Sequence, residues 1–182
     1  RVLAFDMGGT TAKLTLVDGG AARTARAFEV ARVWRFRKGS GLPLRIPVIE
    51  MVEIGAGGGS LASVDALGRI AVGPESAGSE PGPASYGRGG TGATVTDADV
   101  LLGRIDPEAF AGGRMRLDAD AASTALERHV GRPLGLDPAH AALGVSEMVE
   151  ETMASAARVH AVEEGTEVAG RAMIAFGGAA PL

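Results

Sequence analysis

The sequence predicts an α/β domain with a mixed sheet and packed helices, and three observations point to this fold class. Residues 1–18 hold two short apolar runs around a glycine-containing turn, which is typical of two neighbouring strands. Between residues 138 and 165, apolar side chains recur at helical spacing. A further apolar run at residues 172–176 returns to the strand pattern. We expect the three strands to share one sheet, with the helix packed across its face.

The first two strands enclose a turn whose residue types suit a phosphate. Asp6 ends the first strand, a Gly-Gly-Thr-Thr turn occupies residues 8–11, and residues 12–18 form the second, antiparallel strand. Glycines let backbone N–H groups approach an anion, and hydroxyls can donate further hydrogen bonds. A carboxylate near a phosphate needs a cation or water between them. The turn therefore indicates nucleotide phosphate with Mg²⁺, with an ordinary hairpin as the alternative; Lys13 can reach a phosphate or point outward.

The middle of the chain changes from strand patterns to a glycine-rich segment. Residues 28–33 and 46–54 alternate as strands do, with a loop tip at 38–41 between them. Gly makes up 28 of the 182 residues, and the excess falls mainly between residues 55 and 113. A short hairpin is predicted at 61–72 within that segment. Because charged and aromatic residues interrupt its Gly and Pro, we expect an ordered Gly-rich insert that lines a site.

Two helices and a last strand complete the predicted domain. Asp118 or Asp120 can cap the first helix, which we expect to end at Gly131-Arg132-Pro133. Asp137-Pro138 starts the longer helix, for which Gly165 is a plausible terminator. We expect that helix to cover the sheet through Val145, Val149, Met153 and Ala156. The glycines that follow strands 1–6 and 172–176 should then lie at one edge of the sheet, with room for a nucleotide between them.

Composition and charge exclude several classes of protein. The net charge of −4 argues against a general nucleic-acid or membrane-surface role. The chain has no cysteine, which rules out disulfides and thiolate sites. No apolar run approaches the roughly 20 residues of a membrane span, and no signal peptide precedes the first strand, so we expect a cytoplasmic protein. The chain starts inside a strand without an initiator Met, and we expect an internal segment of a longer polypeptide.

Five strings of residues resemble the hydantoinase A/5-oxoprolinase family, which includes the ATP-binding subunits of acetone and acetophenone carboxylases. They are 6–13, 54–62, 72–90, 94–104 and 175–182. The resemblance runs nearly end to end and implies an actin-like ATPase (ribonuclease H-like) fold with two lobes and ATP in the cleft. Residues 1–182 are then a partial hydantoinase A domain, the second-lobe half, with the insert at 55–113. Because the family's first phosphate loop is not among these residues, we expect the segment alone to be inactive.

The resemblance also assigns roles to individual residues. It implies phosphate binding by Gly8, Gly9, Thr10 and Thr11, adenine–ribose contact by Gly177 and Gly178, and a catalytic Asp6 that contacts Mg²⁺-bound water or the attacking oxygen. For the glycines at 57–59, ligand contact and close packing both stay open. For Glu75 and Arg88, contact with a substrate or partner subunit and structural ion pairing both stay open.

The chain departs from the usual family pattern at three positions. Ser85 stands where Cys is usual, which excludes a thiol role there. Asp99 stands where Asn is more usual, and we expect either residue to cap a helix; Asp97, which lies just before the helix, is favoured as a cap as well. Ala180 stands where the closing turn usually has Gly.

The resemblance implies an ATP-dependent amidohydrolase that phosphorylates a small cyclic amide or imide before ring opening. The implied cofactors are ATP and Mg²⁺, and the implied partner is a hydantoinase B type subunit or domain. One alternative is the ATP-binding subunit of a ketone carboxylase. Another is a non-catalytic nucleotide-binding or subunit-docking module, although retention of Asp6 beside the turn disfavours it. A sugar or acetate kinase fits less well, because the long strings between residues 72 and 104 do not match one.

Overall fold

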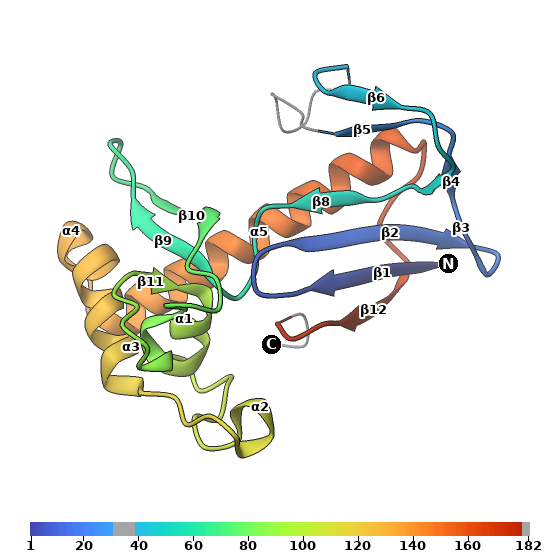
Figure 1. Cartoon of the computed structure of the whole chain (residues 1–182). Helices are drawn as coiled ribbons and strands as arrows, with labels where there is room; N and C mark the ends of the chain where they lie inside the picture. The colour runs from blue at the N-terminus through green and yellow to red at the C-terminus, as the bar shows by residue number, and fades with distance from the viewer. Residues whose placement is uncertain (31–38, 180–182) are drawn as a thin grey trace.

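The computed structural model describes residues 1–30 and 39–179, in which a five-stranded sheet and a smaller helical part share one long helix (Figure 1). The five strands are β1 (Val2–Met7), β2 (Ala12–Asp18), β3 (Ala21–Ala22), β8 (Val52–Ile54) and β12 (Ala172–Phe176). The long helix is α5 (Pro138–Glu163). The mixed α/β architecture predicted from the sequence is confirmed. Parts of the predicted strand 28–33 and loop tip 38–41, and Ala180, lie outside the described residues.

The three strands predicted to share one sheet do so, and β3 and β8 join them. β1 and β2 are antiparallel, with Val2 opposite Val17 and Met7 opposite Ala12. β12 pairs with β1 in parallel, and β8 pairs with β2 on the other side. Because β1 and β12 run in the same direction, their C-terminal ends meet at one edge of the sheet.

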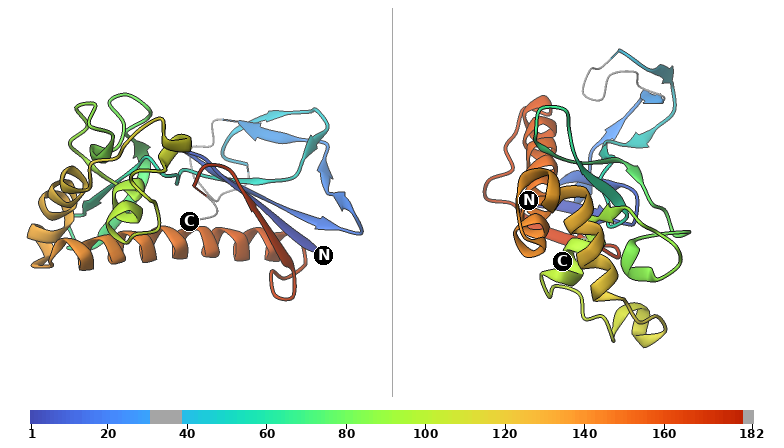
Figure 2. Two further views of the ribbon diagram at one scale, coloured as in Figure 1. Left: turned by 90° about the horizontal axis from the view of Figure 1, so that it is seen from below. Right: turned by 90° about the vertical axis from the view of Figure 1, so that its left-hand side faces the viewer.

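Helix α5 covers one face of this sheet and continues past it to the helical part (Figure 2). Alternate residues of β1 and β2, among them Phe5 and Leu14, are buried in the same hydrophobic core as the helix. The predicted stripe is confirmed, since Val145, Val149 and Ala156 are buried and Met153 packs against the core. Asp137 caps the helix by accepting hydrogen bonds from the N–H groups of Ala139 and His140.

The insert is ordered, as expected, and forms most of the helical part. It contains the sheet β10–β9–β11 and the helices packed on it. Their bounds are β9 Ser60–Val64, β10 Ile70–Ser76, η1 Ala84–Tyr86, β11 Ala93–Thr94, α1 Val95–Leu101 and α2 Phe110–Gly113. After the insert come α3 (Ala119–Leu126), the π-helical turn η2 (Glu127–Gly131) and α4 (Arg132–Leu134). No helix among the described residues is long and apolar enough to cross a membrane.

The N-terminus of α1 confirms Asp97 as a capping residue in part and corrects the prediction for Asp99. Thr94 is the cap and accepts a hydrogen bond from the N–H of Asp97, whose carboxylate bonds back to the N–H of Thr94. The same buried carboxylate accepts hydrogen bonds from the N–H groups of Ala84 and Ser85. Asp97 therefore joins η1 to α1, and Asp99 lies inside the helix.

Two boundaries also differ from the sequence prediction. The predicted strand 46–54 divides into β7 (Val48–Ile49), which pairs with β4 (Thr24–Ala25), and β8. The break falls at Glu50, whose N–H bonds to Arg23 and whose carbonyl accepts from the Thr15 hydroxyl. A further ribbon, β5 (Phe28–Val30) with β6 (Leu42–Leu44), was not fully predicted.

The helix after Asp118 does not end at Gly131-Arg132-Pro133 as predicted. It widens into the π-helical turn η2 and continues through α4 to Gly135, whose φ of 67° ends it. Pro133 is the second residue of α4, which directly follows the π-helical turn. Asp118, rather than Asp120, is the cap of α3.

Candidate functional site

The two glycine turns that follow β1 and β12 meet at one edge of the sheet. We call residues 8–11 the first glycine turn and residues 177–179 the second. The N–H of Gly8 bonds to the carbonyl of Thr11 at 3.1 Å, and the N–H of Ala179 bonds to the carbonyl of Met7 at 3.0 Å. The predicted shared edge is confirmed. The Ala179 bond joins the second turn to Met7, the last residue of β1, rather than to the first turn. The predicted room for a nucleotide between the two turns stays a prediction.

Gly177 explains how closely the turns approach. Its φ of 99° suits glycine, and an added Cβ would lie 2.4 Å from the Met7 carbonyl oxygen and 2.6 Å from Asp6 Oδ1. The role of Gly177 within the chain is therefore to let the second turn pack against the end of β1. Its predicted contact with adenine or ribose stays a prediction.

The glycines at 57–59 support the first glycine turn from behind. The N–H of Gly58 bonds to the Gly8 carbonyl at 3.0 Å, and that of Gly59 bonds to the Gly9 carbonyl at 2.7 Å. A Cβ on Gly57 would lie 2.6 Å from the N of Thr10 and 2.7 Å from the O of Gly8. All three glycines are buried. Of the two readings left open by the sequence, these contacts favour close packing.

The insert holds this support in place. The carbonyl of Gly58 accepts hydrogen bonds from both the N–H (2.7 Å) and the hydroxyl (2.9 Å) of Thr96, near the start of α1. The carbonyl of Gly59 accepts from the N–H of Ala77, just after β10. Through Gly58 and Gly59, the position of the first glycine turn therefore depends on Ala77 and Thr96, which lie more than 60 residues after the turn in sequence.

Three glycines at this edge have no explanation within the described part of the chain. Gly8, Gly9 and Gly178 lack a positive φ, and an added Cβ on any of them would meet no atom of the described residues within 4 Å. Every other described glycine, Gly41 and Gly55 apart, has either a positive φ or a neighbour inside that distance. Neither backbone conformation nor packing requires glycine at these three positions. Close approach of a ligand to the backbone would require it.

Three polar side chains of the edge also lack interaction partners in the described part of the chain. Asp6 is half-buried at the end of β1, Thr10 is exposed and Thr11 is half-buried. Within the described part of the chain, none of these three side chains forms a hydrogen bond or ion pair. Together they offer one carboxylate and two hydroxyls beside the open backbone of Gly8 and Gly9. Among residues 1–30 and 39–179, no cluster of three or more His, Asp or Glu could hold a metal ion by itself.

Glu75 and Arg88 do not form the structural ion pair that the sequence left open. Both side chains are exposed, and neither has an ion-pair partner in the described ranges. Their contact with a substrate or partner subunit stays a prediction.

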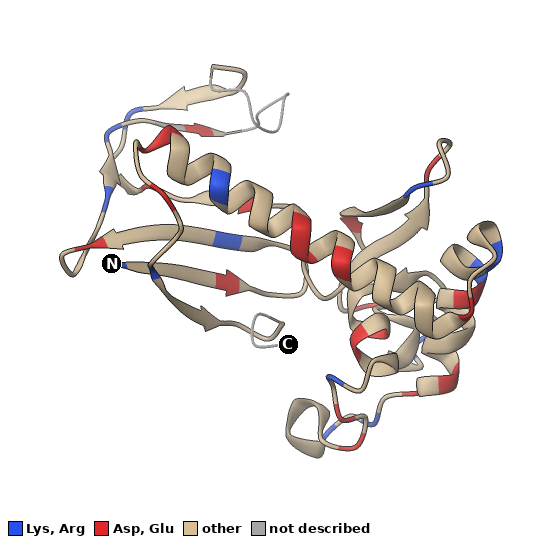
Figure 3. Ribbon diagram, turned by 180° about the vertical axis from the view of Figure 1, so that it is seen from behind, with Lys and Arg blue, Asp and Glu red and all other residues tan. Residues whose placement is uncertain are grey.

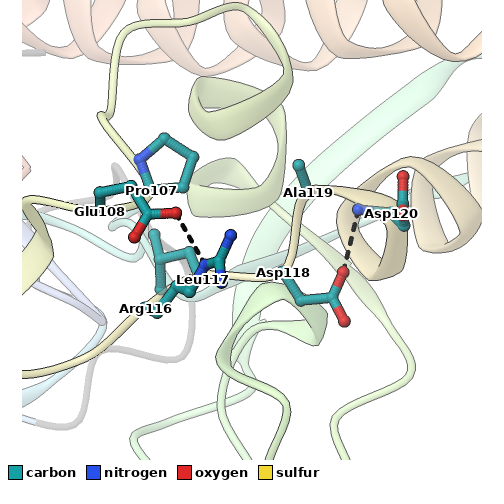
Figure 4. A pocket seen from close by; sticks show the side chains of 7 residues that line it. All are labelled: Pro107, Glu108, Arg116, Leu117, Asp118, Ala119 and Asp120. Carbon is teal, nitrogen blue, oxygen red and sulfur yellow. Dashed lines mark hydrogen bonds and ion pairs between the residues drawn. The ribbon is translucent and has the colours of Figure 1, made fainter.

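A cavity of about 470 Å³ lies elsewhere, between the turn after α1 and the start of α3 (Figure 4). Three of the four charged side chains that line it have structural roles, Asp120 being the exception. Glu108 pairs with Arg116 at 2.7 Å, and Asp118 caps α3. None of the predicted site residues lines it.

A buried carboxylate in the helical part has a strongly altered titration. Burial raises the pKa of Asp99 to about 6; Arg104, 3.5 Å away, opposes the rise and Glu150 adds to it. Arg104 also donates hydrogen bonds to Ser146 and Glu150 on α5. This cluster joins α1 to α5 and contributes no residue to the edge that carries the glycine turns.

All of residues 1–182 match the family described as hydantoinase/oxoprolinase. The chain belongs to this family. It is 39% identical over its whole length to caprolactamase subunit alpha of Pseudomonas jessenii and 39% identical to the acetophenone carboxylase gamma subunit of Aromatoleum aromaticum. It covers 25% and 24% of those two proteins, respectively, so it spans about a quarter of their length.

Two solved structures have the same fold as this family member. The crystal structure of the ATP-dependent caprolactamase from Pseudomonas jessenii matches 97% of the chain with a TM-score of 0.81 and 37% identity. A nucleotide-free structure of acetone carboxylase matches 99% of it with a TM-score of 0.83 and 28% identity. The chain covers 24% of each of those two structures. The resemblance read from the five strings is thus confirmed at the level of the family.

Proposed function

We propose that this chain is the second-lobe half of the nucleotide site in an ATP-dependent enzyme that phosphorylates a cyclic amide before opening its ring. An actin-like lobe needs a sheet with phosphate and nucleoside turns at a common edge. The meeting of both glycine turns at the ends of β1 and β12 supports this assignment. The relatives named ATP-dependent caprolactamase and acetone carboxylase support the use of ATP.

The observation that carries the proposal is the set of unexplained glycines, Gly8, Gly9 and Gly178. An anion can approach backbone N–H groups closely where no Cβ is in the way, and glycine at these three positions keeps the edge free of Cβ atoms. We assign Gly8 and Gly9 to the phosphates, with the Thr10 and Thr11 hydroxyls as further donors. Gly178 then faces the nucleoside side, next to the packing residue Gly177.

Asp6 is the proposed catalytic residue of this half-site. A lone carboxylate beside phosphates repels them unless a cation or water separates the charges. We assign Asp6 to a water of a bound Mg²⁺ or to the attacking oxygen; Mg²⁺, when bound, would neutralise phosphate charge. Asp6 has no competing hydrogen bond or ion pair within the described part of the chain, so its carboxylate is available for either role.

The proposed chemistry removes the resistance of an amide to hydrolysis. Nitrogen delocalisation makes the carbonyl carbon a poor electrophile, and transfer of the γ-phosphoryl group to the carbonyl oxygen relieves this. Water then adds to the carbon, the ring C–N bond breaks, and a second water releases phosphate. The balance is cyclic amide, ATP and two waters to an amino acid, ADP and phosphate. This half of the site contributes positioning and charge neutralisation.

A partner subunit is part of the proposal. Relatives of this chain bear the names caprolactamase subunit alpha and acetophenone carboxylase gamma subunit, which are names of subunits of larger assemblies. We extend this to the present protein and propose a hydantoinase B type partner or domain that completes the amide site.

The test measures release of phosphate by the full-length protein with its partner, on ATP plus a lactam, a hydantoin or 5-oxoproline. We expect release that depends on one of these amides and is abolished by Asp6→Asn. Asp120→Asn, at an exposed carboxylate of α3, is the matched control and should retain activity. Near-normal turnover by Asp6→Asn would refute its role. Phosphate release that requires a ketone and bicarbonate, and no amide, would favour the carboxylase alternative.

A further inference from the structure

Three charged residues of alternating sign lie in one row across three neighbouring strands. Asp6 on β1 is directly opposite Lys13 on β2, and Lys13 is directly opposite Glu53 on β8. Directly opposite residues of antiparallel strands point to the same face, with Cβ atoms about 5 Å apart. Figure 3 shows the basic position on β2 beside the acidic position on β1. The row lies on the face that α5 does not cover, since alternate residues Phe5 and Leu14 are buried under the helix.

The row is not an ion-pair network. In the described part of the chain, neither Lys13 nor either carboxylate has an ion-pair partner, although their positions would allow one. The Lys13 and Glu53 side chains are exposed. Other charged residues of the chain do pair closely, for example Arg171 with Asp18 at 2.9 Å. Among the described residues, the Lys13 ammonium is therefore an unpaired cation on the open face.

Lys13 also lies within reach of the first glycine turn. It is the second residue of β2, and Thr11 precedes it by two residues, about 7 Å along the strand. A lysine has a flexible four-carbon stem that can cover this distance. Its charge is thus available to an anion on Gly8 and Gly9.

We propose that Lys13 is a further phosphate-binding residue of this site and that Glu53 positions it. The proposal rests on the proposed function and adds to it the cation that faces the outer phosphates of the nucleotide. Glu53, on the side of Lys13 away from Asp6, attracts the ammonium and keeps it over the open face. The ligand that this set recognises is a nucleoside di- or triphosphate, rather than a monophosphate.

The test measures binding of ATP, ADP and AMP to the full-length protein by calorimetry. Lys13→Met should weaken ATP and ADP about tenfold or more and AMP less than about twofold, because only the outer phosphates lose a charged contact. Lys13→Arg should retain most of the affinity. Arg69→Met, which removes an exposed cation at the hairpin tip between β9 and β10, is the matched control and should change nothing. Equal weakening of all three nucleotides, or none, would overturn the proposal.

The role of Glu53 is tested by a double-mutant cycle on ADP binding. Glu53→Gln should weaken ADP about threefold in the presence of Lys13 and have no effect in Lys13→Met, because its action passes through Lys13. Additive effects would contradict that role. If the wild-type protein binds none of the nucleotides, the proposed function itself fails. If it binds them and Gly8→Ala weakens them while Lys13→Met does not, only the present inference fails.

Discussion

The edge that carries the two glycine turns and the glycine-rich insert use the same residue for different purposes. In the insert, the glycines other than Gly55 occupy left-handed turns or places where a Cβ would meet a neighbouring atom, as at Gly90, where it would lie 2.1 Å from the Gly82 carbonyl oxygen. At the edge, Gly8, Gly9 and Gly178 meet neither condition. Glycine in the insert therefore serves the fold. At Gly8, Gly9 and Gly178 neither purpose applies within the described residues, which agrees with the proposed contact with a nucleotide.

This difference predicts how substitutions divide. Changes in the insert should alter the free energy of unfolding and leave the intrinsic affinity for nucleotide unchanged. Changes at Gly8, Gly9 and Gly178 should lower the affinity for nucleotide and leave the free energy of unfolding nearly unchanged. The supporting glycines at 57–59 lie between the two regions, since they belong to the insert but contact the first glycine turn.

The largest effect is expected from Gly57→Ala. Its Cβ would lie within 2.7 Å of backbone atoms of Gly8, Gly9 and Thr10, which cannot yield as a side chain can. We expect a loss of about 3 kcal/mol in unfolding free energy, together with loss of ATP binding by the folded fraction. Gly90→Ala is the matched clash within the insert and should lower stability while folded protein still binds ATP. Chemical denaturation measures the stability of both variants, and calorimetry measures their ATP binding. Intact ATP binding by Gly57→Ala would show that the glycines at 57–59 do not determine the position of the binding turn.

A somewhat smaller effect is expected from Asp99→Asn, with a defined pH dependence. Because burial raises the pKa of Asp99 from 3.8 to about 6, the folded state binds more protons than the unfolded state between these pH values. Stability from this group is present below pH 4 and lost as pH rises through about 6. Asn removes the buried charge, so the variant should be about 2 kcal/mol more stable than wild type at pH 8 and nearly equal at pH 4.

Chemical denaturation of both proteins at pH 4 and pH 8 measures this effect. The affinity for ATP should not change, because the Asp99 cluster contributes no residue to the edge with the glycine turns. A variant less stable than wild type at pH 8 would show that the Arg104 pairing outweighs the burial of the charge. Arg104 keeps Glu150 and Ser146 as partners in the variant, at 2.9 and 2.7 Å.

The smallest effect is expected at Ser85, whose buried hydroxyl has no hydrogen-bond partner among the residues that the structure describes. Ser85→Ala removes this unsatisfied group and should raise the unfolding free energy by about 1 kcal/mol. Ser85→Cys should also be tolerated, since a thiol has a weaker need for a partner. A loss of stability in the Ala variant would mean that the hydroxyl has a partner in solution. ATP binding should not change in either variant.

Local patterns predicted the parts of the fold that depend on neighbours in sequence. The hairpin of β1 and β2, the cap of α5 at Asp137 and the strand β12 all follow from periodicity and turn residues within short windows. The break at Glu50 did not follow, because a hydrogen bond from Thr15, 35 residues earlier, fixes it. Local sequence also mispredicted the end of the helix after Asp118, which continues through Gly131 and Pro133 to Gly135 although both residue types disfavour helix.

The candidate site divides in the same way. Asp6 and the residues of the first glycine turn could be named from one string of sequence. The support at 57–59 and the row that brings Glu53 beside Lys13 could not, because each depends on strand pairing or loop packing between distant segments. For Glu53, the sequence offered a strand pattern at residues 46–54, and the structure supplied the pairing of that strand with β2.

The most direct test of the account compares Gly8→Ala and Gly9→Ala with wild type in the full-length protein. Because an added Cβ meets nothing within 4 Å at either position, the unfolding free energy should stay within about 0.5 kcal/mol of wild type. Affinity for ATP should fall about tenfold or more, because the Cβ takes the place of a phosphate. Unchanged affinity in both variants would show that these glycines do not hold a nucleotide and would contradict the account.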